Sequence, residues 1–92
     1  MTGKQRAALR AQANPLDTIL HVGKGGVTDA VATQAEGALR TRELIKGRVL
    51  ETAPESAKDV CAALCERTGA EPIQVVGRVF VLYRYNPELH TA

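Results

Sequence analysis

Hydrophobic and polar residues recur along the chain with two different periods, which predict seven secondary-structure elements. Apolar residues three and four positions apart predict helices over residues 2–14, from residue 28 onward, and between residues 56 and 69. Runs rich in β-branched and apolar residues predict strands over residues 18–22, 44–51, 72–76 and 79–85. The expected fold class is therefore α/β, with the element order α-β-α-β-α-β-β.

Capping residues mark the ends of the predicted helices. Thr2 is followed three residues later by Gln5, which is the pattern of a capping box, and Pro15 cannot continue the first helix. Thr28 and Ser56 are favourable N-caps for the second and third helices.

The order of the elements restricts how the strands pair. Helical connections between the early strands favour parallel pairing, whereas residues 72–85 predict an antiparallel hairpin with Gly77-Arg78 as a type II′ turn. We therefore expect a single four-stranded mixed sheet, with two helices on one face and the N-terminal helix at least partly on the other. Pairing Val76 with Val79 would place one apolar set on each face of the hairpin: Ile73, Val75, Phe80 and Leu82 on one side, and Val76, Val79, Val81 and Tyr83 on the other. Because both sets are apolar, both faces are expected to be covered.

The composition suits one folded domain over residues 1–92, since 45% of the residues are hydrophobic and 24% are charged. The longest apolar run covers residues 60–65, far short of the roughly 20 residues that span a bilayer, and the first residues lack the apolar segment of a signal peptide. These features predict a cytoplasmic protein with no membrane partner. In that compartment Cys61 and Cys65 are expected to be reduced core residues.

Positive charge is concentrated in the first half of the chain, although the net charge is only +2. Residues 1–48 hold eight Lys or Arg against four Asp or Glu, whereas residues 49–92 hold four against six. A basic half on a small domain indicates a polyanionic partner, and an ordinary solvated surface is the alternative.

The segment Gly23-Lys24-Gly25-Gly26 is the most informative candidate site, because it joins a predicted strand to the start of a helix. Glycines let the backbone approach a bulky ligand closely, and the helix directs N–H groups and a partial positive charge at the loop. Together with the charge of Lys24, these features predict a phosphate-binding site. The alternative is a glycine-rich turn without a ligand.

Known phosphate-binding patterns differ in how well they fit this segment. A nucleotide-triphosphate P-loop requires G-x-x-x-x-G-K followed by Ser or Thr, and a dinucleotide fingerprint would need glycine where Thr28 stands. The spacing of Gly23 and Gly26 instead fits the G-x-x-G loop that clamps a nucleic-acid backbone in KH-type domains. The pattern therefore favours nucleic acid over a nucleotide cofactor, and we expect no cofactor.

Three ordered segments resemble the signatures of the CRM domain, the chloroplast RNA splicing and ribosome maturation family. They are LHVGKGGVT at residues 20–28, ELIK at residues 43–46 and VVGRVFVLYR at residues 75–84. The resemblance extends from about Lys4 to Arg84, and at this length the chain is most similar to the stand-alone bacterial YhbY-type RNA-binding proteins. The resemblance implies an RNA-binding domain with a G-x-x-G loop that associates with maturing large ribosomal subunits. In plant relatives it implies intron splicing.

Some positions of this chain match the CRM pattern and others depart from it. Gly23 and Gly26 match the loop glycines, Lys24 a variable loop position, and Lys46 the lysine that follows Glu-Leu-Ile. Gly47 stands where an apolar strand residue is usual, which predicts a loosened strand or a bulge. Residues 86–92 contain no Lys or Arg, so we expect no RNA contact through a basic tail.

Other side chains are candidates for RNA contact outside the loop. The basic ones are Lys4, Arg6 and Arg10 on the first helix, and Lys46 and Arg48 on one face of the second strand. The alternatives are a solvated helix face, and pairing of the strand cations with carboxylates such as Glu43 or Glu51. Tyr83 or Tyr85 could stack on a base, with a structural role at the sheet edge as the alternative.

No set of catalytic or metal-binding residues stands out in the sequence. His21 and His90 lie far apart without a third ligand in view, so neither an enzyme, a metal nor a small-molecule substrate is expected. We predict an RNA-binding protein that holds ribosomal RNA precursor or the maturing large ribosomal subunit through the loop and the basic surface. The alternatives are a protein-interaction module in a ribonucleoprotein particle with no direct RNA clamp, and a nucleotide-using enzyme.

Overall fold

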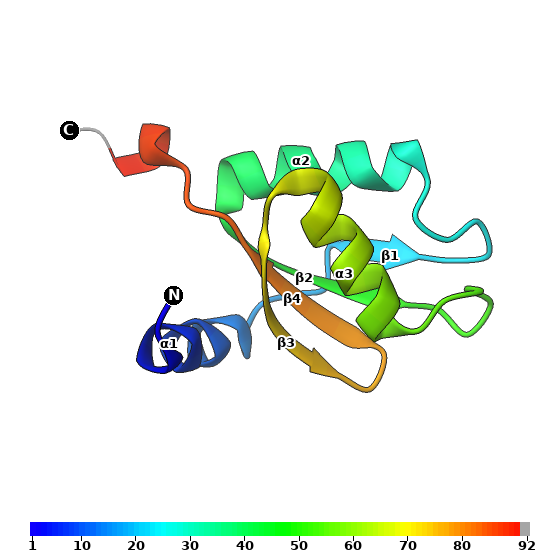
Figure 1. Ribbon diagram of the computed structural model, residues 1–92, viewed down its shortest axis with the longest axis horizontal. Coiled ribbons are helices and arrows are strands. Elements are labelled where there is room, and N and C mark those ends of the chain that lie inside the picture. Colours follow the sequence, from blue (N-terminus) through cyan, green and yellow to red (C-terminus); the bar gives the residue numbers. More distant parts are fainter. Residues whose placement is uncertain (91–92) are drawn as a thin grey trace.

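The computed structural model describes residues 1–90 and has the element order that the sequence predicts (Figure 1). Its elements are α1 (Gly3–Ala13), β1 (Leu20–Val22), α2 (Asp29–Arg42), β2 (Leu44–Val49), α3 (Ala57–Thr68), β3 (Glu71–Val76) and β4 (Val79–Tyr83), followed by the short 3-10 helix η1 (Pro87–His90). The α/β fold class is confirmed, and η1 was not predicted. Strands β1, β2 and β4 are each shorter than predicted, by about two residues at one end.

The four strands form one mixed sheet in the order β1-β2-β4-β3, with β1 parallel to β2 and both other pairs antiparallel. Helices α2 and α3 lie together over one face, and α1 lies across the other face (Figure 1). Both features agree with the prediction. Gly77 has a φ of 59°, which fits the first position of the expected type II′ turn.

The predicted caps explain where the helices begin and end. Thr2 and Gln5 form the complete capping box of α1, and the side chain of Ser56 accepts the Asp59 N–H at the start of α3. Gly69 ends α3 in the left-handed conformation, with a φ of 76°.

The main core lies between the sheet and the helices α2 and α3, and Phe80 fills its centre. Gly47 on β2 is paired with Phe80 on β4, and a Cβ built on Gly47 would overlap the Phe80 ring. The residue that departs from the family pattern therefore makes room for an aromatic side chain. The expected bulge is wrong, because β2 pairs with β4 without interruption through Gly47.

A smaller apolar cluster holds α1 against the other face of the sheet. Its buried members are Ala13, Ile73 and Val81, so Ile73 lies with Val81 and not with Phe80 as predicted. The reason is a shift of register between Pro72 and Gln74, which changes the alternation of side chains along β3. Val75 and Val76 remain 40% and 60% exposed, so the prediction that both faces of the hairpin are covered is wrong near its turn.

Both cysteines are free, with Cys61 buried and Cys65 half-buried on α3. The Cys65 thiol donates a hydrogen bond to the sulfur of Cys61, and this bond together with burial raises the pKa of Cys65. Within residues 1–90, no helix is long and apolar enough to span a bilayer.

Candidate nucleic-acid interface

Three connections meet at one end of the sheet, which we call the loop end. Because β1 and β2 are parallel, the loop of residues 23–28 and the loop of residues 50–56 both leave the sheet there. The β3–β4 turn reaches the same end, since β4 is antiparallel to β2 and the Val49 N–H donates to the Arg78 carbonyl over 2.8 Å. Figure 1 shows the loops after β1 and β2 side by side at the right of the view, on the opposite side from α1 and η1.

The glycine loop is a tight turn of which only part faces solvent. The Gly26 N–H donates to the Gly23 carbonyl over 2.9 Å, and Gly26 is buried with a φ of 68°. The Gly26 N–H is therefore not available to a ligand, and Gly26 shapes the turn. Lys24 and Gly25 are exposed, and their N–H groups take no part in the hydrogen bonds within the loop.

The start of α2 adds a partial positive charge behind the loop. The side chain of Thr28 caps the helix by accepting the Val31 N–H over 3.2 Å. Asp29 in the first turn forms an ion pair with Arg67 of α3, which offsets its negative charge. The helix end therefore favours an anion at the exposed part of the turn.

A carboxylate limits the directions from which an anion can approach. A Cβ built on Gly26 would lie 2.7 Å from Oε1 of Glu55 and 3.5 Å from Pro54. Glu55 thus lies against the buried glycine, and its charge repels phosphate on that side. Lys24 and Gly25 are left as the accessible part of the loop.

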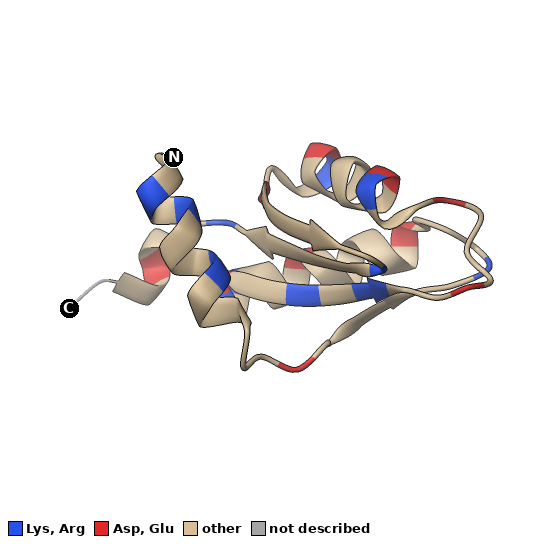
Figure 2. Cartoon of the chain, turned by 90° about the horizontal axis from the view of Figure 1, so that it is seen from below, with Lys and Arg blue, Asp and Glu red and all other residues tan. Residues whose placement is uncertain are grey.

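The predicted basic residues share the face of the sheet that carries α1. Figure 2 shows this face, with blue segments on α1 beside blue segments on the sheet. Lys4, Arg6 and Arg10 lie on α1, and Lys46 and Arg48 lie on β2. Within residues 1–90 none of the five forms an ion pair, so the alternative of pairing with Glu43 or Glu51 is wrong.

Two of these five cations nevertheless have structural contacts. Arg6 donates to the carbonyl of Pro72, and Nζ of Lys46 donates to the carbonyl of Asn14 over 3.3 Å. Both contacts tie α1 to the rest of the fold. Arg48, by contrast, is exposed and has no such partner among the described residues.

The structure adds His21 and Arg78 to the predicted residues. Strand pairing places His21 beside Arg48, and the hairpin brings Arg78 to the same place. Together with Val49, Leu50 and Glu51, these three side chains line a shallow hollow at the loop end. From the sequence, Arg78 was interpreted only as a turn residue and His21 only as a lone histidine. Their position beside Arg48 follows from the strand register, which the sequence does not reveal.

Comparison with known proteins places this fold in a family. The profile of the CRS1 / YhbY (CRM) domain matches residues 1–84. The chain belongs to the CRM family. Among curated proteins it is 42% identical over 88 residues to the "Probable RNA-binding protein YqeI" of Bacillus subtilis, with 96% of this chain and 92% of the relative covered. It is 32% identical to an "RNA-binding protein" of Haemophilus influenzae, covering 96% and 89% of the two chains.

A solved structure has the same CRM fold. The solution structure of the hypothetical protein SAV1595 from Staphylococcus aureus matches with a TM-score of 0.79 and 38% sequence identity. The match covers 94% of this chain and 90% of that one. The architecture described above is therefore that of a CRM domain over nearly its whole length.

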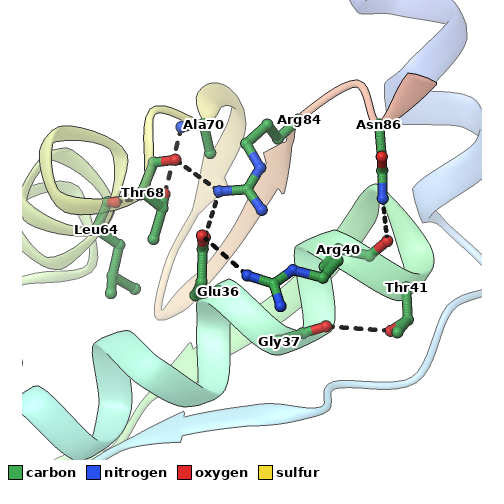
Figure 3. A network of polar contacts seen from close by, with 9 residues as sticks. All are labelled: Glu36, Gly37, Arg40, Thr41, Leu64, Thr68, Ala70, Arg84 and Asn86. Atoms are coloured by element: carbon green, nitrogen blue, oxygen red, sulfur yellow. Dashed lines mark hydrogen bonds and ion pairs between the residues drawn. The ribbon is translucent and has the colours of Figure 1, made fainter. Parts of the chain in front are cut away.

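Not every cation of this CRM domain is free to bind a ligand. Arg84, after β4, donates to the carboxylate of Glu36 and to the Thr68 carbonyl, as Figure 3 shows. Arg40 lies 3.8 Å from the same carboxylate. These contacts join α2, α3 and the end of β4 at the end of the sheet opposite the loop.

The tyrosines also lie away from the loop end of the CRM domain. Tyr83 packs beside the α1 cluster, and Tyr85 stacks on His90 with ring centroids 4.8 Å apart. His90 contacts the Glu43 carboxylate over 2.9 Å, which also accepts the Asn86 N–H over 2.7 Å. These contacts favour the structural alternative for Tyr83, whereas Tyr85 is 56% exposed and base stacking by it stays a prediction.

Proposed function

We propose that this CRM domain binds RNA through the exposed part of its glycine loop and the basic face of its sheet. The observation that carries the proposal is that Lys24 and Gly25 lie at the same end of the sheet as the unpaired Arg48. Relatives named as RNA-binding proteins, which align with nearly the whole chain, support it. Such names favour a binding role without catalysis.

The N–H groups of Lys24 and Gly25, the Lys24 ammonium and the start of α2 would hold a backbone phosphate. Lys4, Arg10 and Arg48 would orient the rest of the RNA, with Arg6 and Lys46 adding charge while they hold α1. Backbone contacts of this kind position a ligand without reading its sequence. As the CRM resemblance implies, we propose ribosomal RNA precursor in the maturing large ribosomal subunit as the target.

A gel-shift experiment with fragments of large-subunit ribosomal RNA over a salt series tests the proposal. Lys24→Gln should lower the slope of log affinity against log salt by about 0.7–0.9, the value of one phosphate contact. Gly25→Asp should weaken binding about ten-fold or more, because it places a negative charge beside the phosphate. A Cβ on Gly25 would lie tightly against the Thr28 methyl, at 3.3 Å, with no other atom within 4 Å, so the Thr28 side chain must shift slightly to accept the substitution.

Two substitutions on the opposite face serve as controls. Lys58→Gln removes an exposed cation from α3, and Gly37→Asp adds a carboxylate at an exposed position of α2 with no atom within 4 Å. If the loop variants and these controls lowered RNA affinity equally, the RNA site would lie outside the loop. If the wild-type protein bound no RNA, the protein-interaction alternative would replace this proposal.

A further inference from the structure

One row of side chains crosses all four strands on the face of α1 without being covered by it. The register pairs His21 with Arg48, Arg48 with Val79, and Val79 with Val76. Directly paired residues point to the same side of a sheet, so these four side chains form one row. Helix α1 covers the neighbouring part of this face, where Val81 is buried.

The two halves of this row differ in chemistry. His21 and Arg48 are exposed polar residues on β1 and β2, and Arg78 extends this half from the hairpin turn. Val76 is 60% exposed on the outer strand β3, beside the half-buried Val79. A cationic patch therefore adjoins a small apolar patch, at the same end of the sheet as Lys24.

We propose that this row, which we call the open row, is a subsite for one unpaired nucleotide of the bound RNA. The inference rests on the proposed function and names the form of RNA that the site takes. Arg48 and Arg78 hold a phosphate, and the base lies against Val76 and Val79. Arginine suits this role because its planar guanidinium matches phosphate oxygens and can make two hydrogen bonds to them.

The dimensions and chemistry of the open row favour an unpaired nucleotide over a duplex or a protein. Arg48 and Val76 are two strand spacings apart, about 10 Å, which is within the reach of one nucleotide. In A-form RNA the bases are stacked inside the helix and the major groove is deep and narrow, so a flat sheet cannot contact a base face. The apolar patch is small and adjoins cations, which favours a polyanion over an apolar protein partner. Glu51 lines the same hollow and keeps the phosphate on the side of the arginines.

Three RNAs with one shared hairpin stem separate the contributions of the subsite. The first is blunt, the second carries a short uridine extension, and the third carries an extension of abasic riboses that keeps the phosphates. The wild-type protein should bind the uridine extension more tightly than the blunt hairpin, with the abasic RNA between them.

Variants of the open row should then affect different RNAs. Val76→Ser should weaken binding of the uridine extension about five-fold, through lost apolar contact, and leave the abasic and blunt RNAs unchanged. Arg78→Gln should weaken both extended RNAs and lower their salt slope by about 0.7. Val75→Ser is the matched control, because Val75 lies on the same strand, points to the other face and is 40% exposed. Lys58→Gln is the control for charge.

The outcomes distinguish this inference from the proposed function. If the wild-type protein bound all three RNAs equally, the open row would not be a nucleotide site, while RNA binding through the loop would stand. Equal losses for Val76→Ser and Val75→Ser would also overturn the inference. No binding of any RNA by the wild-type protein would overturn both. Thermal melting of each variant verifies that the fold is retained.

Discussion

The two ends of the sheet contain similar cationic residues and use them differently. At the loop end Lys24, Arg48 and Arg78 are exposed and form no ion pair within residues 1–90. At the opposite end Arg84 is bound by Glu36 and by the carbonyl of Thr68. A cation whose hydrogen bonds are already made inside the fold contributes stability, and one without partners remains available to a ligand.

The backbone follows the same division. At the opposite end Glu43 has a φ of 63°, which non-glycine residues rarely adopt. Several contacts hold it there, including hydrogen bonds from its N–H to the Leu39 carbonyl and from the Arg84 N–H to its own carbonyl, both 2.9 Å. At the loop end the only positive φ values, at Gly26 and Gly77, are on glycines. Backbone hydrogen bonds therefore hold a non-glycine residue in a rare conformation at the opposite end, whereas glycines adopt the positive φ values of the loop end.

The largest effect is expected at Gly47, which lies between the two ends. Gly47→Ala would force the Phe80 ring to move, and overpacking of this kind costs about 1–3 kcal/mol. Urea unfolding measures this loss. In a protein that already carries Phe80→Leu, the same Gly47→Ala substitution should cost less, because the smaller side chain returns space. If Gly47→Ala cost as much in the Phe80→Leu protein as in the wild type, the glycine would be required for its backbone conformation and not for the space that the Phe80 ring fills.

Exchanging one arginine at each end should separate stability from binding. Arg84→Gln should lower the free energy of unfolding by about 0.5–1.5 kcal/mol, since it removes the hydrogen bonds of Arg84 to Glu36 and to the Thr68 carbonyl and leaves Glu36 with Arg40, and RNA affinity should not change. Arg48→Gln should leave unfolding unchanged and lower the salt slope of RNA binding by about 0.7. The comparison of the two ends would be wrong if both variants changed the same property.

The sequence predicts the elements of both ends better than their contacts. The element order, the caps at Thr2, Thr28 and Ser56 and the hairpin turn are local features, so short segments suffice to predict them. The side on which Ile73 lies depends on a register shift between strands, and the place of Arg78 beside Arg48 depends on the pairing of β2 with β4. No local pattern contains that information, since it arises only when distant strands meet. For the same reason, the carboxylate of Glu55 beside Gly26 could not be predicted.

Removing the Glu55 carboxylate should raise the affinity of the loop end for RNA. Glu55→Gln should raise RNA affinity about two-fold at low salt, because a half-buried negative charge next to the loop is lost. Glu66→Gln, at an exposed position of α3 away from the loop, is the matched control. If both variants raised affinity equally, the gain would come from net charge and not from the position of Glu55.

The smallest effect is expected from acid at the opposite end. The hydrogen bond from the Asn86 N–H, with a further one from His90, lowers the pKa of Glu43. A carboxyl group whose pKa is lowered by folding stabilises the structure above its ordinary range, and this contribution is lost as the pH falls through the lowered value. Acid should therefore release residues 86–90 from Glu43 and separate the Tyr85 and His90 rings. NMR shifts of the Tyr85 ring measure this release, and Glu43→Gln should remove its dependence on pH below the ordinary glutamate range. If the Tyr85 ring of Glu43→Gln kept the wild-type acid profile, the release would depend on another group, and Glu43 would not be the residue that holds this segment.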